Sequence, residues 1–317
     1  MTTTAGGYFG IDVGKGWLDL AVFGSNVVQR VKNDVEGISK VVAQMAIAMP
    51  QLVVVEASGG YETALVEALQ MEQLPIAVAN PTRVRALAKA EGKLAKTDKI
   101  DARLIAEYAC KIQPNAQKPK EERELHLKAL VTRREQLVEM RVTEQHRLGT
   151  TPESMRADVG EHIEWLTGQI TKLEDHIQDL VDLLPELKEQ AERLDTIPGV
   201  GSITAVTVVV EMPELGQLNR QQIAALAGLA PFNQDSGKKR GKRRIFGGRK
   251  GVRRVLYMAC LSAIVHNPVI RQFHERLLGK GKLFKVSITA CMRKMLTIMN
   301  AMARDKLDWG EPVRKAS

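Results

Sequence analysis

Several features are scarce in this sequence, and each absence narrows the class of protein. The chain of 317 residues holds only 3 cysteines, and they form no CxxC pair. We therefore expect small buried thiols in a reducing compartment. No run of about 18 apolar residues occurs, so no membrane-spanning helix is predicted. The first residues lack a basic segment followed by an apolar stretch, so we expect no secretory signal and a cytoplasmic location.

Acidic residues are scarce in the last third of the chain. Residues 191–317 carry 23 basic and 9 acidic residues, whereas residues 1–112 are neutral and residues 113–190 carry a net charge of −5. The last segment therefore supplies all of the excess in the net charge of +9. Such asymmetry is typical of a protein that binds a polyanion, and nucleic acid is the leading candidate when membrane features are absent.

Hydropathy patterns divide the chain into three predicted parts, and the first, residues 1–112, is an α/β domain. It begins with three strand patterns, at 8–13, 17–23 and 26–31, and the first two are separated by Gly14-Lys15-Gly16, which predicts a hairpin. Helical patterns follow at 36–48, 61–73, 82–91 and 98–111, and apolar strand patterns lie among them at 52–58 and 75–81. This series predicts helices layered on a sheet.

The second part, residues 113–190, is predicted to be helical. One helix covers 121–148, and a second starts with Thr151 as its N-cap and runs to Pro185. Its apolar residues are spaced alternately four and three apart, at Val159, Ile163, Leu166, Ile170, Leu173, Ile177, Leu180 and Leu184. This heptad pattern fits a hairpin within one chain or a coiled coil between subunits, and we favour a coiled-coil dimerisation segment.

The third part, residues 191–317, is predicted to be mostly helical, with helices at 220–228, 250–265, 268–278 and 285–303. Ile197-Pro198-Gly199-Val200-Gly201 lies between two short helical patterns and resembles a helix-hairpin-helix. In that motif Gly199 and Gly201 would let backbone N–H groups approach a phosphate. The alternative is an ordinary tight turn between helices.

Four carboxylates of the first part require an explanation. Asp12 ends the first strand, Glu56 follows four apolar residues of a buried strand, and Asp98 and Asp101 share one face of a helix. Residues 1–112 contain no histidine. A converging set of carboxylate oxygens suits Mg²⁺ or Mn²⁺ and not Zn²⁺, and two such ions can activate a nucleophile at a phosphodiester.

The stretch 235–254, DSGKKRGKRRIFGGRKGVRR, combines a serine with a high density of positive charge. Its glycines would let it approach a nucleic-acid backbone, and its basic residues would neutralise phosphates. A solvated turn is the simplest interpretation of Asp235-Ser236-Gly237 when it is taken alone. The predicted nucleic-acid contacts are Lys238, Lys239, Arg240, Lys242, Arg243, Arg244, Arg249, Lys250, Arg253 and Arg254.

These motifs, in this order, resemble those of a known family. GIDVGK, VVVEASGGYE and NPTRVRALAKAEGKLAKTDKIDARLIAEYA resemble the RuvC-like, RNase H-fold domain of the DEDD-type insertion-sequence transposases. IPGVGSITA, LAGLAPFNQDSGKKRGKRRIFGGRKGVRRVLYMA and MRKMLTIMNAM resemble the C-terminal transposase domain of that family, and Piv-type DNA invertases share the plan. Gly14 and Ser202 depart from the family pattern, at positions where many members carry Ser and Pro.

The resemblance implies a role for each matching residue. Asp12, Glu56, Asp98 and Asp101 would bind the metal ions, and Ser236 would be the nucleophile that joins DNA through a phosphoserine. It also implies a noncoding guide RNA that pairs with donor and target DNA. Dimers would pair into a tetramer, with the acidic site of one subunit meeting the serine of another. A prokaryotic cytoplasmic protein associated with the nucleoid is expected.

Two other functions stay open at this stage. A nuclease of the Holliday-junction type, or a DNA invertase, could use the same acidic site, and the nuclease would use water as its nucleophile. An architectural nucleic-acid-binding protein would use the helix-hairpin-helix and the basic stretch without cutting DNA.

Overall fold

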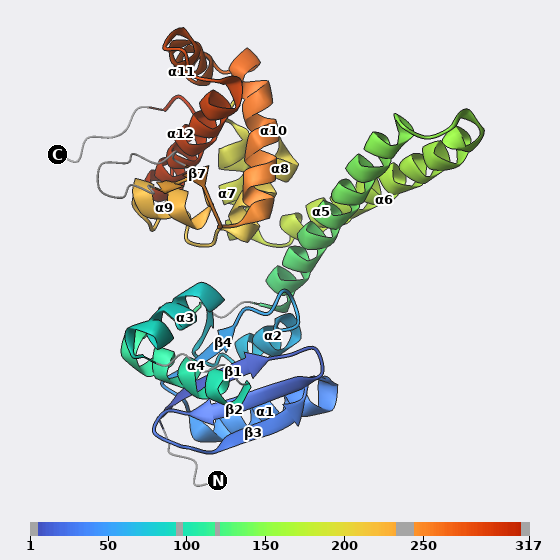
Figure 1. Ribbon diagram of the computed structural model, residues 1–317. Helices are drawn as coiled ribbons and strands as arrows, with labels where there is room; N and C mark the ends of the chain where they lie inside the picture. Colours follow the sequence, from blue (N-terminus) through green and yellow to red (C-terminus); the bar gives the residue numbers. More distant parts are fainter. Residues whose placement is uncertain (1–5, 93–97, 118–120, 233–243, 312–317) are drawn as a thin grey trace, which may run out of the picture. The chain divides into compact units, whose positions relative to one another are not determined.

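The computed structural model describes residues 6–92, 98–117, 121–232 and 244–311. It divides into two compact units, Met1–Leu125 and His126–Ser317, and each is described by itself (Figure 1). The second unit contains most of the predicted middle part together with the predicted C-terminal part. The side chains of Asp98, Lys99 and Ile100 lie outside the description.

The first unit is built on a five-stranded sheet, which confirms the predicted strands. Its order is β3-β2-β1-β4-β5. The bounds are Tyr8–Val13 for β1, Trp17–Val22 for β2, Val28–Lys32 for β3, Leu52–Glu56 for β4 and Ile76–Ala79 for β5. Strands β1, β2 and β3 pair antiparallel, as the predicted hairpin requires, whereas β4 pairs parallel with both β1 and β5. The two acid-bearing strands, β1 and β4, are therefore neighbours near the middle of the sheet.

Helices cover both faces of this sheet (Figure 1). One hydrophobic core joins the sheet to α1 (Val35–Ala48) and α2 (Thr63–Met71). A second core joins the opposite face to α3 (Pro81–Ala90) and α4 (Asp98–Ile112). This double coverage explains why β4 is a continuous apolar run, since side chains on both of its faces are buried.

Gly10 fixes the distance between β1 and α4. A Cβ atom at Gly10 would lie 2.1 Å from the backbone nitrogen of Ala106 and 2.5 Å from the carbonyl oxygen of Ala102. Only glycine allows this close approach of helix backbone to strand. Helix α4, which begins at Asp98, therefore lies directly on the strand that ends in Asp12 and Val13.

The second unit begins with a long helical hairpin. Helix α5 (Glu122–Leu148) is followed by a short 3₁₀ helix, η1 (Glu153–Met155), and by α6 (Arg156–Asp182). Part of the predicted heptad pattern packs on α5 of the same chain, since Leu166 and Ile170 form a cluster with Leu137. The hairpin within one chain is thus present, and dimerisation through it stays a prediction.

The predicted start of the second hairpin helix is wrong. The Thr151 hydroxyl donates a hydrogen bond of 2.8 Å to the carbonyl oxygen of Arg147, so it satisfies the end of α5 and does not cap the next helix. Pro152 precedes η1, and α6 starts at Arg156. Thr151 lies three residues after Leu148, the last residue of α5, and its hydroxyl bonds to a carbonyl oxygen of the last helical turn.

The remaining helices pack around one large hydrophobic core that also takes in parts of α5 and α6. They are α7 (Pro185–Asp195), α8 (Ser202–Glu211), α9 (Arg220–Leu226), α10 (Lys250–His266), α11 (Pro268–Gly279) and α12 (Phe284–Asp305), close to the predicted ranges. A two-stranded sheet was not predicted: β6 (Pro231–Phe232) pairs antiparallel with β7 (Arg244–Ile245). These strands lie on either side of segment 233–243, which contains Ser236.

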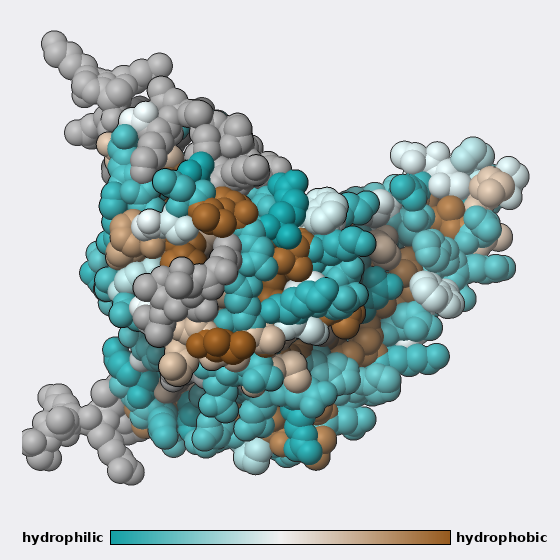
Figure 2. All heavy atoms as spheres, turned by 90° about the horizontal axis from the view of Figure 1, so that it is seen from below, coloured by the Kyte–Doolittle hydropathy of each residue, from teal (hydrophilic) through white to brown (hydrophobic). Residues whose placement is uncertain are grey.

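The helices in the described part of the chain are not of the membrane-spanning type, because none is both long and apolar enough. Figure 2 shows mostly hydrophilic residues on one face, with hydrophobic residues in small separate patches.

Candidate active site

Strands β1 and β4 place Asp12 and Glu56 side by side. Their parallel pairing runs in register as far as Ile11 opposite Val55, and the two carboxylates are the next residue on each strand. Adjacent strands are about 4.8 Å apart, so the two side chains start at that spacing. Both residues are half-buried. The sequence-based prediction that these two acids converge therefore agrees with the sheet register.

Both carboxylates are on the sheet face that α4 covers. Gly10 faces α4, and Asp12 is two residues further along the same strand, hence on the same face. Val54 packs in the core that includes α4, and Glu56 is two residues beyond it. The sheet thus aims both acids toward the helix that carries the other predicted pair.

A third sheet carboxylate, Asp19, extends this row and was missed from the sequence. Asp19 on β2 is the direct antiparallel partner of Asp12, so their side chains share a face. It is only 4% exposed. Arg30 on β3 neutralises it through two hydrogen bonds, Nε to Oδ1 at 2.7 Å and Nη2 to Oδ2 at 2.6 Å. The available signal was an acid at an inward position of the strand WLDLAV.

On α4, Asp101 is buried and already has a cationic partner. It is 8% exposed, and the Arg85 guanidinium of α3 donates to both of its carboxylate oxygens, at 2.9 and 3.0 Å. A guanidinium therefore already neutralises Asp101, and the predicted role of Asp101 as a metal ligand stays a prediction. Asp98 is the first residue of α4, and its side chain lies outside the described residues.

The loop after Glu56 is held by a carboxylate of its own. Glu62 accepts hydrogen bonds from the backbone nitrogen of Ser58 at 3.1 Å, the Ser58 hydroxyl at 2.9 Å and the backbone nitrogen of Gly60 at 2.8 Å. Burial by itself would raise the pKa of Glu62, but these hydrogen bonds outweigh it and hold the pKa below its ordinary value. Glu62 therefore orders the chain next to the acidic row.

The described carboxylates fit part of a metal site. Among the side chains that the structure describes, no group of three or more His, Cys, Asp or Glu is placed to hold an ion. Asp12 and Glu56 offer adjacent hard oxygen donors of the kind that Mg²⁺ and Mn²⁺ prefer. Asp101 would have to share its oxygens with Arg85 or exchange it for the ion. The metal cage thus stays a prediction, and the donor chemistry agrees with it.

Ser236 lies outside the described residues. So do five of the predicted basic contacts, Lys238, Lys239, Arg240, Lys242 and Arg243. Arg244 is described, in β7, and is exposed. No ion pair of Arg244 occurs in the described part of the chain. It is therefore the described member of the basic stretch best placed for an external phosphate.

The other four predicted basic contacts have partners inside the second unit. Arg249 donates to both carboxylate oxygens of Glu214, at 2.6 and 2.7 Å. Arg253 donates to the carbonyl oxygens of Ala227 and Gly247. Lys250 and Arg254 both pair with Glu139 of α5. These side chains hold helices together, which the sequence pattern did not indicate.

At two glycines of the predicted nucleic-acid-binding segments, the backbone conformation and the close packing of neighbouring atoms require glycine. Gly199 has a φ of +98°, and a Cβ there would lie 2.7 Å from the Cα of Ala263 in α10. Gly248 has a φ of +71°, and a Cβ there would lie 2.1 Å from the backbone nitrogen of Gly228. Gly201, directly before α8, is exposed and has nothing within 4 Å of its Cβ position. Gly201 therefore shows no packing reason to be glycine.

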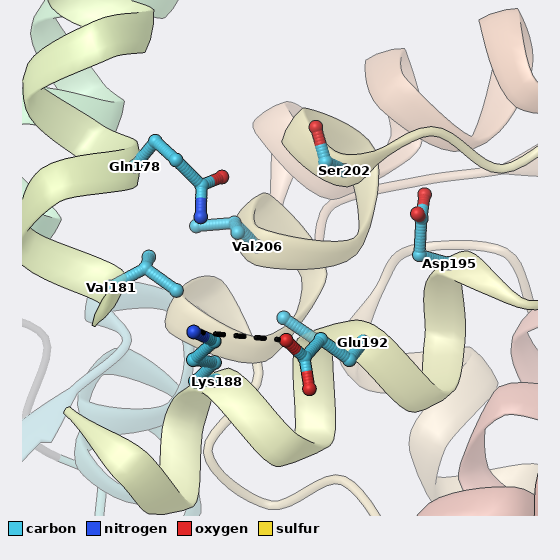
Figure 3. A pocket seen from close by; sticks show the side chains of 8 residues that line it. Gln178, Val181, Lys188, Glu192, Asp195, Ser202 and Val206 are labelled. Atoms are coloured by element: carbon cyan, nitrogen blue, oxygen red, sulfur yellow. Dashed lines mark ion pairs between the residues drawn. The ribbon is translucent and has the colours of Figure 1, made fainter.

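A pocket between α6, α7 and α8 adjoins this turn (Figure 3). Its polar lining includes Lys188, Glu192, Asp195 and Ser202. The Lys188 ammonium lies 3.9 Å from a carboxylate oxygen of Glu192. Two carboxylates beside the first residue of α8 disfavour a phosphate there. The pocket therefore gives no support to phosphate binding by the helix-hairpin-helix.

The fold and the acidic row define a class of protein. A sheet that gathers carboxylates beside an acid-bearing helix, in a chain with a strongly basic helical region, is typical of enzymes that act on nucleic-acid phosphodiesters.

Comparison with known proteins places the chain within that class. Residues 9–151 match the DEDD-type transposases of IS110, and residues 191–275 match the transposase family IS116/IS110/IS902. The pilin gene-inverting proteins of Moraxella bovis and Moraxella lacunata are each 31% identical over 307 residues, which covers 94% of this chain and 95% of each relative. The chain therefore belongs to the IS116/IS110/IS902 transposase family, and it is a DNA-recombining enzyme.

Proposed function

We propose that this enzyme cuts and rejoins the DNA of its own mobile element, with a metal-binding acidic site and Ser236 as nucleophile. The observation that carries the proposal is the register of β1 and β4, which sets Asp12 beside Glu56 on the face covered by α4. Asp98 and Asp101 are in the first turn of that helix.

Asp12, Glu56, Asp98 and Asp101 would hold Mg²⁺ or Mn²⁺. Such ions stabilise the charge that develops on the phosphoryl and leaving oxygens. Arg85 would position Asp101 until the ion binds, since it holds both carboxylate oxygens. Arg30 would keep Asp19 from adding uncompensated charge next to Asp12.

Ser236 would supply the covalent step. Its hydroxyl oxygen attacks the phosphorus of a DNA phosphodiester and loses its proton to a general base. A bond forms between Oγ and phosphorus while the bond to one deoxyribose oxygen breaks. That oxygen leaves with a proton, and a phosphoserine link remains. The hydroxyl of a second DNA end then attacks the phosphoserine, which releases Ser236 and rejoins the strand.

The partners would be the DNA of element ends and target, and a noncoding guide RNA that pairs with both. The basic stretch 238–244 would contact phosphates. Subunits would associate as dimers and tetramers, and the hairpin of α5 and α6 would bring them together. A cytoplasmic, nucleoid-associated protein follows from such a substrate.

The experiment is to trap protein–DNA adducts with the full-length chain. Wild type is expected to form an adduct that survives denaturation, Ser236→Ala none, and Asp12→Asn none or very little. Ser262→Ala, at an exposed serine of α10, is the matched control and should behave as wild type. An adduct with Ser236→Ala would assign the nucleophile elsewhere. Cleavage without an adduct in wild type would favour the Holliday-junction-type nuclease, and binding without any cleavage the architectural protein.

Inversion is a second candidate outcome of the same chemistry, because both relatives are named for inverting a pilin gene. A plasmid that carries two candidate sites in inverted orientation distinguishes the two. Flipping of the intervening segment would identify an invertase, whereas excision and insertion of the element would identify a transposase.

A further inference from the structure

A second basic surface lies outside the stretch around Ser236. It is formed by residues 276–286, called here the 276–286 turn, which end α11 and begin α12. Between Glu275 and Asp305 the sequence contains no acidic residue. The turn itself carries Arg276, Lys280, Lys282 and Lys285. Figure 1 shows α11 at the opposite end of α10 from β7, so this surface belongs to elements other than those of the serine stretch.

The lysines of the turn do not contribute to ion pairs in the described part of the chain. Lys280, Lys282 and Lys285 are all exposed, and no salt bridge of theirs occurs there. In the same unit, by contrast, Lys250, Arg249 and Arg254 are paired with glutamates. The charge of the turn is therefore available to an external anion.

Apolar side chains are exposed among these lysines. Leu283 is 76% exposed and Val286 is 52% exposed. Phe284 is 46% exposed, with its ring edge against buried His274. A single exposed leucine would carry no information, but three exposed apolar side chains within four residues form a patch, which is typical of an interaction surface. Lysines interleaved with apolar residues suit a nucleic-acid groove, where ammonium groups neutralise phosphates and apolar side chains contact sugars or base edges.

The backbone of the turn is fixed by its own hydrogen bonds. The nitrogens of Lys280 and Lys282 donate to the carbonyl oxygen of Leu277, at 3.2 and 3.1 Å, and the nitrogen of Gly281 donates to Leu278 at 2.8 Å. Gly281 takes a φ of +72°, which a residue with a side chain rarely adopts. The lysines thus project from an ordered turn, which lowers the entropy cost of binding.

We propose that the 276–286 turn binds the phosphodiester backbone of a nucleic acid, with Lys280, Lys282 and Lys285 on phosphates and Leu283 against sugars or base edges. The proposal deepens the proposed function and rests on it, because a recombinase must hold nucleic acid away from the cut phosphate. It adds a binding surface on α11 and α12 to the one predicted for residues 238–254.

The test is the salt dependence of binding by the full-length chain. Fluorescence anisotropy would follow a labelled duplex DNA of arbitrary sequence, and a labelled RNA hairpin, from low to high salt. In Lys280→Ala/Lys282→Ala/Lys285→Ala, the slope of log K against log salt should become shallower by about 1 for each lysine that contacts a phosphate. The probe whose slope changes identifies DNA or RNA as the source of the phosphates.

Two further variants make the result specific. Lys128→Ala/Lys172→Ala/Lys188→Ala removes the same charge from the hairpin and its neighbour α7, and it should leave both slopes near the wild-type values. Leu283→Ala should weaken binding at every salt concentration without changing the slope, because it removes an apolar contact and no charge.

The outcomes separate this inference from the proposed function. If wild type binds and forms adducts while the triple lysine variant keeps the wild-type slope on both probes, the inference is overturned and the proposed function stands. If the Lys128/Lys172/Lys188 variant reduces the slope as much as the Lys280/Lys282/Lys285 variant, the effect comes from net charge and not from the turn. The inference is then also overturned. If wild type binds neither probe, both fail. Circular dichroism of each variant confirms that the fold is retained.

Discussion

At the scale of single residues, the acidic row is controlled by its arginines. Asp19 and Asp101 are both nearly buried, and each is held by two hydrogen bonds from one guanidinium, Arg30 or Arg85. Arginine suits this role because its planar fork binds both oxygens of a carboxylate and stays charged. Arginines of the protein thus neutralise both Asp19 and Asp101.

Removing Arg30 tests the first of these pairs. Arg30→Gln should lower the free energy of unfolding by about 1–2 kcal/mol, because Asp19 stays buried and loses its charged partner. The figure is modest because the arginine side chain is 45% exposed and water screens the pair. Urea unfolding followed by circular dichroism would measure it. Lys32→Gln on the same strand is the control, and an equal loss there would contradict the assignment.

Glu62 predicts a dependence on pH. Its pKa is lowered in the folded protein, so its stabilising contribution is complete above the unfolded value of about 4.3 and is lost as pH falls through the lower folded value. Glu62→Gln should therefore be less stable than wild type near pH 7, with the difference shrinking below about pH 4. Thermal unfolding of both proteins across this range measures it. Glu72→Gln, at the other end of α2, is the control for loss of one carboxylate, and an identical pH profile in both variants would contradict the assignment.

The acidic row also shows which residues could be predicted from the sequence alone. The sequence alone singles out Asp12 and Glu56, because a carboxylate in or after an apolar strand is costly unless a partner or a ligand compensates it. Asp19 and its partner were not found, because the importance of Asp19 depends on β2 pairing with β1 and on β3 supplying Arg30. Local periodicity indicates neither which residues face each other across two strands nor which distant residue completes an ion pair.

At the scale of elements, the α/β domain was predictable because its signals are long and repeated. Buried strands of four or more apolar residues and helices of at least nine residues carry enough periodicity to be recognised. Strands β6 and β7 have two residues each, too few to show an alternation. The heptad pattern predicted an apolar face, but it could not say whether α5 or another subunit would cover it.

Gly10 tests how closely α4 must approach the sheet. Gly10→Ala should lower stability by about 3 kcal/mol or more and reduce strand cleavage, because its Cβ would collide with the backbone of α4 and push Asp98 and Asp101 away from Asp12. Gly14→Ala is the control, since a Cβ atom at Gly14 would lie 3.6 Å from its nearest neighbour, the carbonyl oxygen of Trp17. Urea unfolding and cleavage assays should separate the two variants. Wild-type stability in Gly10→Ala would mean that α4 can shift without cost.

Arg254 and Arg244 distinguish structural from nucleic-acid-binding arginines in one basic stretch. Arg254→Ala should lower the free energy of unfolding by about 1–3 kcal/mol, because Glu139 keeps only Lys250 as a partner and Glu135, whose pKa is raised by burial, loses compensating charge. Arg244→Ala should leave stability within about 0.5 kcal/mol of wild type and weaken binding to duplex DNA instead. Denaturation and anisotropy measured on both variants would check this. Equal effects on stability would contradict the distinction.

At the scale of the whole molecule, charge and acid site are carried by different parts of the sequence. The carboxylate row belongs to the first unit, while the excess positive charge and Ser236 belong to residues 191–317. Carboxylates repel phosphates and basic residues attract them, so we expect the basic part to bind the DNA on which the proposed acidic site acts. The acids and the serine can therefore be supplied by the same subunit or by two different subunits.

Mixing two inactive variants decides between these arrangements. Asp12→Asn keeps the serine and Ser236→Ala keeps the acidic row, so each homo-oligomer should be inactive alone. If one subunit's acids act on the serine of another, oligomers assembled from both variants contain some sites with both groups intact, and adduct formation should return. The two chains would be co-expressed so that mixed oligomers form during assembly, and the adducts would be counted on denaturing gels. The double variant Asp12→Asn/Ser236→Ala mixed with either single variant is the control and should stay inactive. No recovery in the co-expressed pair would place both groups of each site in a single chain, and the hairpin of α5 and α6 would then need no role in joining them.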